Sequence, residues 1–138
     1  MNSHVEIYLH FVWATWDRHP LIEPEWERDL WRKIRVEATD QNCRVLALGG
    51  TADHVHLLVQ FHSMLTVANF VQQTKGPSSR FVNEVIQPES QFKWQGAYGA
   101  FSVGHDEVPG IIEYIKHQKS HHANHSLLER YERTTIIE

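Results

Sequence analysis

Apolar residues at every second position near the N-terminus constrain the fold more than any other feature. Residues 4–15 read HVEIYLHFVWAT, and one side of an extended chain would carry Val5, Ile7, Leu9, Phe11 and Trp13. A period of two over this length predicts a β-strand. Residues 16–22, which contain Pro20, then predict a turn.

The next segments predict a helix followed by two strands. A helix is expected from Glu23 to about Asp40, because Pro24 and acidic residues occupy its first turn and apolar residues recur every four positions. Residues 44–48 and 54–61 predict two short strands, joined by the tight connection GGTAD. Together these segments predict a helix that leads into a β-hairpin.

A second helix is predicted to begin with Thr66 as its cap. The pair Gly76-Pro77 predicts a break in this helix, because proline lacks the backbone donor that a helix interior needs. We expect the helix to restart toward Val85, with Pro77 at a first helical position.

The C-terminal part of the chain predicts one more strand and one more helix. Residues 87–97 read as a loop and residues 98–103 as a strand. The last helix is expected from Asp106, as its cap, to about Asn124, with Pro109 in its first turn.

The predicted order is β-α-β-β-α-β-α, which indicates the α+β class. The first six elements match the ferredoxin-like split βαβ arrangement, a four-stranded antiparallel sheet with two helices on one face. The other face is left for a partner, a ligand or the added C-terminal helix. A length of 138 residues predicts a single domain over 1–138.

Composition limits the functional classes. The net charge of −4 argues against strong non-specific binding of duplex DNA, because counterion release needs Lys and Arg. Stacking of bases on some of the five Trp, four Tyr and six Phe residues stays open. Cys43 is the only cysteine and starts an apolar strand, which predicts a core residue. No membrane-length apolar run or signal-peptide pattern occurs, so we expect a cytoplasmic protein.

Two histidines two residues apart are the first candidate site. His54 and His56 share one face of their strand, while Val55, Leu57 and Val59 would point into the helices. Such a pair can offer two ring nitrogens to one metal. The alternative is two half-exposed histidines on the uncovered face.

The last predicted helix carries the second candidate set. Tyr114 and Gln118 are four residues apart and so lie on one helical face. The alternatives are a packing tyrosine and a solvated glutamine. Histidines also recur on this helix at a spacing that can bind zinc, but we favour a solvated, partly basic helix end; these are His117, His121, His122 and His125.

These motifs together resemble a known family, the HUH-type single-tyrosine transposases of small insertion sequences (TnpA-like), with their REP-associated relatives. HUH denotes two histidines around a bulky apolar residue, here His54-Val55-His56 within DHVHLLV. The resemblance also covers FVWAT, VQQTKGPSSRFVNE, WQGAYGAFSVG and EYIKHQ, in the right order along nearly the whole chain.

The resemblance implies a role for each matched residue. His54, His56 and Gln118 would bind a divalent metal, Mg or Mn, and Tyr114 would be the catalytic nucleophile. Single-stranded DNA with hairpin ends would be cleaved and rejoined through a 5′-phosphotyrosine. The family also implies a homodimer, in which the tyrosine helix can complete the active site of the other subunit, and association with the nucleoid when DNA is bound.

Several cationic and aromatic side chains are candidates for DNA contacts. Trp94 and Tyr98 could stack on extruded bases, and the alternative for both is a core aromatic. The candidates for phosphate contacts, each of which could equally be a solvated charge, are Lys75, Arg80, Lys93, Lys116 and Lys119.

Three functions compete at this stage. The first is a metal-dependent DNA strand transferase that acts through Tyr114. The second is a catalytically silent or domesticated relative that binds single-stranded or hairpin DNA. The third is an unrelated ferredoxin-like metal hydrolase that uses the histidines alone. The complete set of His54, His56, Tyr114 and Gln118 favours the first.

Overall fold

The structure, a computed structural model, describes residues 3–119 of the chain. The predicted order of strands and helices is confirmed. The elements are β1 (Tyr8–Ala14), α1 (Glu27–Asp40), β2 (Arg44–Gly50), β3 (His54–Gln60), α2 (Val67–Phe81), β4 (Gly99–Val103) and α3 (Val108–Lys116). Short helical turns also occur at Trp16–Arg18, Val82–Ile86 and His105–Glu107.

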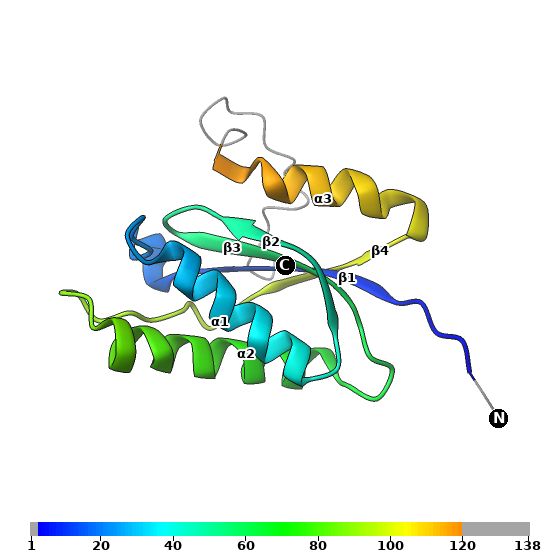
Figure 1. The fold of residues 1–138 in the computed structure, drawn as a ribbon, viewed down its shortest axis with the longest axis horizontal. Coiled ribbons are helices and arrows are strands. Elements are labelled where there is room, and N and C mark those ends of the chain that lie inside the picture. The colour runs from blue at the N-terminus through cyan, green and yellow to red at the C-terminus, as the bar shows by residue number, and fades with distance from the viewer. Residues whose placement is uncertain (1–2, 120–138) are drawn as a thin grey trace.

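The four strands form one antiparallel sheet in the order β2-β3-β1-β4. This is the strand order of the ferredoxin-like fold, so the predicted fold class is correct. Figure 1 shows α1 and α2 against one face of the sheet and α3 across the opposite face. The face of the sheet that α1 and α2 leave uncovered is therefore covered by α3 of the same chain.

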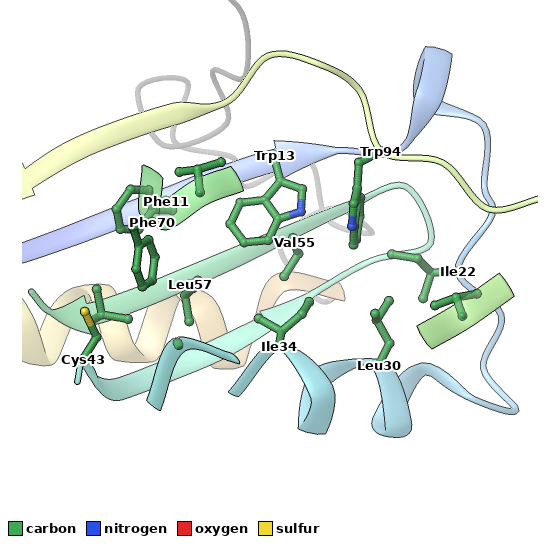
Figure 2. Packing of buried hydrophobic residues seen from close by; sticks show 14 of the residues in the cluster. Phe11, Trp13, Ile22, Leu30, Ile34, Cys43, Val55, Leu57, Phe70 and Trp94 are labelled. Carbon is green, nitrogen blue, oxygen red and sulfur yellow. The ribbon is translucent and has the colours of Figure 1, made fainter. Parts of the chain in front are cut away.

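The larger core lies between the sheet and the helix pair α1 and α2. Phe11 and Trp13 of β1 point into it, together with Val55 and Leu57 of β3, as the period-two pattern predicts (Figure 2). Cys43 is also buried in this cluster, in agreement with its prediction. Alternate residues along β1 and β3 therefore form the main core, and the residues between them lie on the face that α3 covers.

A smaller core fixes α3 on the second face. Its buried members are Ala47, Leu58 and Val103 from the sheet and Ile111 and Ile115 from α3. The isoleucines lie four residues apart, so one side of the helix is apolar. This contact places the next residues of α3 over β3.

The predicted break at Gly76-Pro77 is wrong, because α2 runs through Pro77 without interruption. The buried side chains of α2 include Thr74 and Ser78, which lie on either side of the proline. Packing on both sides holds the helix straight through the position where proline removes one backbone hydrogen bond. Two side chains also bond to backbone within the helix, Thr74 to the Phe70 carbonyl at 2.8 Å and Ser78 to the Lys75 carbonyl at 3.0 Å.

Several element ends also differ from the prediction, because α1 begins at Glu27 rather than Glu23 and α3 ends at Lys116 rather than near Asn124. β1 begins at Tyr8, so Val5 and Ile7 lie before the strand and are 40% and 39% exposed. Asp106 does not cap α3 but lies in the short turn before it. In that turn the Gly104 amide donates to the Glu107 carboxylate at 2.9 Å, so the acidic side chain that stabilises the turn is the neighbouring one.

Candidate functional site

Three histidines gather on the face of the sheet that α3 covers. His54 and His56 of β3 and His10 of β1 are each fully buried. The alternative of half-exposed histidines is therefore wrong. His10 was not among the residues predicted from the sequence. Val12 of β1 pairs with His56 of β3, and His10 lies two residues before Val12 on the same face of the sheet. This relation is visible only once the pairing of β1 and β3 is known.

His54 is held on both sides of its ring. Its Nδ1 lies 2.8 Å from a carboxylate oxygen of Asp53 and 2.9 Å from the Thr51 hydroxyl. Its Nε2 lies 3.1 Å from Oε1 of Gln118, at the end of α3. The hydrogen bond with His54 lowers the pKa of Asp53, and nearby Arg18 contributes, so this carboxylate is charged at neutral pH.

His56 contacts the tyrosine helix and a neighbouring strand. Its Nδ1 lies 2.9 Å from Nε2 of His10. Its ring meets the ring of Tyr114 edge-on, with 5.8 Å between the centroids. Nδ1 of His56 thus faces a second imidazole, whereas Nδ1 of His54 faces a carboxylate and a hydroxyl.

Tyr114 and Gln118 are both buried, with 5% and 1% of their surface exposed. Tyr114 lies in α3 and Gln118 lies two residues beyond its end, where the Gln118 amide donates to the Tyr114 carbonyl at 3.4 Å. The two are therefore neighbours as predicted, and the alternative of a solvated glutamine is wrong. Gly49 of β2 allows the close approach of α3, because a Cβ there would lie 3.0 Å from the Ile115 carbonyl oxygen. The sequence motif around Tyr114 and the His54-Val55-His56 motif thus meet in one place.

The donor set fits a divalent metal. Nε2 of His54 and the amide oxygen of Gln118 lie 3.1 Å apart, and the His56 ring centre lies 5.1 Å from that of His54. Nδ1 of each ring has a hydrogen-bonding partner, as is usual for metal-binding histidines. Two neighbouring ligands about 2.1 Å from an octahedral ion lie about 3 Å apart, which agrees with the 3.1 Å between His54 and Gln118. Within residues 3–119 there is no cluster of three or more His, Cys, Asp or Glu side chains that could hold a metal.

A cleft of about 500 Å³ opens beside Gln118, between the start of α1, the end of β2 and the end of α3. Lys119 crosses its rim to the Glu27 carboxylate at 2.7 Å. Lys116 is exposed near Glu113, and the His117 ring binds the Glu113 carbonyl at 2.9 Å. His121, His122 and His125 lie outside the described residues.

Two of the other predicted DNA contacts, Lys75 and Arg80, lie on α2, which packs against the opposite face of the sheet (Figure 1). Arg80 is exposed on α2. Lys75 points back into the protein, where its ammonium donates to the backbone carbonyls of Gln95 and Ala97, and burial lowers its pKa to about 8.

Trp94 is a core residue, as its alternative interpretation stated. It is 6% exposed, packs edge-on against Trp13, and its indole donates to Ser78 at 3.1 Å. Tyr98 is half-buried against the same core. The exposed indole near the site is instead Trp16, which is 46% exposed and has the Lys93 ammonium 4.0 Å above its ring centre.

Comparison with known proteins identifies the family. The model of the family described as "Transposase IS200 like" matches residues 3–118. The chain belongs to this transposase family. Its relatives include the transposase of insertion sequence element IS200 from Salmonella typhimurium, with 30% identity over 115 residues, 79% of this chain and 74% of the relative. The ISDra2 transposase TnpA from Deinococcus radiodurans is 26% identical over 119 residues, 82% of this chain and 84% of the relative.

Two solved structures have the same fold. A crystal structure of a transposase-like protein from Deinococcus radiodurans R1 superposes with a TM-score of 0.69 at 25% identity, and covers 86% of this chain and 95% of that one. A REP-associated tyrosine transposase bound to a REP hairpin gives a TM-score of 0.64 at 10% identity, and covers 95% of this chain and 76% of that one. None of the helices in residues 3–119 is long and apolar enough to cross a membrane.

Proposed function

We propose that this IS200-like transposase cleaves and rejoins single-stranded DNA through Tyr114 with the help of a divalent metal. The observation that carries the proposal is the contact between Gln118 Oε1 and His54 Nε2 at 3.1 Å. It joins the helix of the nucleophile to the strand of the two histidines, so one site holds both a nucleophile and a metal-binding donor set.

The proposed chemistry assigns the bond changes to Tyr114. Its phenol oxygen forms a bond to the scissile phosphorus, the bond from phosphorus to the 3′-oxygen breaks, the phenol loses its proton and the 3′-oxygen gains one. The product is a 5′-phosphotyrosine and a 3′-hydroxyl, so the reverse attack by another 3′-hydroxyl rejoins the strand without a further energy source.

A phenol has an ordinary pKa near 10 and is a weak nucleophile at neutral pH. Mg or Mn bound by His54, His56 and Gln118 would polarise the phosphate and neutralise the charge that develops on it. The protein's own contribution is to hold the Tyr114 ring edge-on against His56, next to that donor set.

The net charge of the chain is −4, so attraction between the protein and DNA phosphates is expected to be weak. The DNA bases would therefore also need an aromatic ring on which to stack. Trp16 follows the end of β1 that pairs with His54, and Lys93 covers its ring. Arg18 in the same turn lies 3.7 Å from Asp53, the partner of His54. We therefore place the incoming strand along Trp16 and Lys93 rather than on Trp94; base stacking on such a ring contributes about 1–3 kcal/mol. The bound hairpin of the REP-associated relative favours hairpin-ended strands as the DNA.

The experiment uses labelled single-stranded DNA from both flanks of the gene, incubated with purified protein and Mn or Mg. We expect a metal-dependent band of protein-linked DNA on a denaturing gel. Tyr114→Phe should lose the band, whereas Tyr98→Phe, a matched change at a half-buried tyrosine, should keep it. Trp16→Ala should weaken binding of the strand and still give the band at saturating DNA.

The outcomes separate the competing functions. A mobility shift with no covalent band at either metal indicates a silent DNA-binding relative. DNA hydrolysis that persists in Tyr114→Phe indicates a hydrolase that uses the histidines alone. Either result would overturn the proposal.

A further inference from the structure

We infer that His10 is a positioning residue, which fixes the proton and the orientation of the His56 ring so that His56 Nε2 can bind the metal. The inference rests on the proposed function, and it adds to that site a residue outside the His54-Val55-His56 motif. Its basis is the hydrogen bond of 2.9 Å between His10 Nε2 and His56 Nδ1.

The sheet register brings these two rings together. His10 on β1 pairs with Leu58 on β3, and Val12 pairs with His56, so His10 and His56 are diagonal neighbours on one face. Both side chains are fully buried, and their ring centres are 5.1 Å apart with the planes tilted by 30°. Burial and packing therefore leave the facing nitrogens little freedom to move apart.

The position of one proton decides what His56 can do. Only one of the two facing nitrogens can carry the hydrogen that lies between them. A neutral imidazole that offers Nε2 to a metal carries its proton on Nδ1. For His56 to offer Nε2 to a metal, it must donate from Nδ1, and His10 must accept at Nε2.

The two proposed histidine ligands thus have different partners. His54 Nδ1 faces the Asp53 carboxylate and the Thr51 hydroxyl, whereas His56 Nδ1 faces a second imidazole. Without an acceptor at position 10, the buried Nδ1 proton of His56 would lose this partner, which is unfavourable for a buried donor. Moving the proton to Nε2 would avoid that cost and remove the lone pair that the metal needs.

Substitutions at position 10 can test this directly. The oxygen of glutamine reaches about as far as Nε2 of histidine, asparagine is one methylene shorter, and leucine fills the space without an acceptor. His10→Gln should therefore preserve the function of His10, and His10→Asn and His10→Leu should not. Thermal melts by circular dichroism establish which variants fold.

Two measurements report on the role of His10 and do not depend on an activity assay. Long-range ¹H–¹⁵N spectra of the metal-free protein should place the His56 proton on Nδ1 in the wild type and His10→Gln, and on Nε2 in His10→Leu. Calorimetric titration with Mn²⁺ should give an affinity about 10–100-fold weaker for His10→Leu and His10→Asn than for the wild type. His10→Gln should stay within about threefold of the wild type, since its amide oxygen restores the acceptor.

The results decide the inference separately from the proposed function. If His10→Leu keeps the proton on Nδ1 and binds Mn²⁺ as the wild type does, the inference is wrong. If His10→Leu does not fold, the comparison of His10→Gln with His10→Asn decides, and equal affinities overturn the inference. A wild-type protein that binds no Mn²⁺ and forms no covalent band refutes the proposed function instead, and the proton position still reports whether His10 orients His56.

Discussion

The two buried clusters on opposite faces of the sheet should respond differently to the same substitution. Ile34 of α1 is fully buried in the larger cluster, and Ile115 of α3 is 1% exposed in the smaller one. Ile34→Ala and Ile115→Ala remove the same atoms from equally buried sites. Only the second change weakens the surface that holds the helix of Tyr114 against the sheet.

The expected size of the effect follows from the small cluster. Truncation of a buried isoleucine to alanine costs about 2–5 kcal/mol. α3 contributes only Ile111 and Ile115 to the buried part of this cluster, and a helix of nine residues is not stable alone in water. The loss should therefore appear mainly as undocking of α3, and 2 kcal/mol corresponds to a factor of about 30 in that equilibrium.

Hydrogen exchange of backbone amides measures the two effects separately. In Ile115→Ala we expect protection of the α3 amides to fall by about 30-fold or more, while β1 and β3 keep theirs. Formation of the covalent band should slow only in proportion to the loss of the docked fraction of the protein. In Ile34→Ala the slowest-exchanging amides and the melting temperature should fall, and the rate of band formation at 25 °C should stay within about twofold of the wild type.

One result would refute this reasoning. If both variants lower α3 protection and band formation to the same extent, the two faces of the sheet unfold as one cooperative unit. The smaller cluster would then not be the separate support of the tyrosine helix that its position indicates.

Two further predictions concern stability. Pro77→Ala restores one helix hydrogen bond in α2, although alanine also makes the unfolded chain more flexible. In urea titrations the net effect should be a free energy of unfolding that is higher by about 2 kcal/mol. An unchanged midpoint would mean that the proline ring stabilises α2 by packing. Burial lowers the pKa of Lys75 from 10.5 to about 8. Between these two pH values the unfolded chain binds more protons at Lys75 than the folded chain does. Lys75 therefore makes the free energy of unfolding rise with pH, by at most about 1.4 kcal/mol per pH unit. Lys75→Met should remove that rise in thermal melts across pH 8–10, and an identical slope in both proteins would contradict the buried position of the ammonium.

The fold could be predicted from the sequence because its strands and helices have clear periods. The alternation around Phe11 and Trp13 and the four-residue repeat before Asp40 each correspond to a buried face. Pro77 was misread because a local rule about proline competes with packing on both sides of it, and only the three-dimensional contacts show which wins. Trp94 could not be assigned either, since an indole in a loop segment has no period that indicates burial.

The candidate site was predictable where its residues form local motifs. His54 and His56 share a strand face, and Tyr114 and Gln118 share a helix side, so spacing alone pairs them. The contact between the two motifs spans 64 residues, and only the resemblance to a known family connects them in the sequence. His10 has neither a local motif nor a matched position, because its partner lies 46 residues away on another strand.

Metal binding and docking of α3 should be coupled, since the proposed ligands come from both sides of the contact. His54 and His56 belong to the sheet and Gln118 follows α3, so an ion bound by all three favours the docked helix. At a metal concentration of 100 times the dissociation constant, metal binding stabilises the docked helix by about 2.7 kcal/mol. This is close to the lower end of the roughly 2–5 kcal/mol that Ile115→Ala is expected to cost. Saturating Mn²⁺ should therefore restore much of the α3 protection that Ile115→Ala loses, and Gln118→Ala in the same background should abolish that rescue. Because coupling is reciprocal, the Ile115→Ala protein should also bind Mn²⁺ more weakly than the wild type, in proportion to the fraction of molecules in which α3 is undocked.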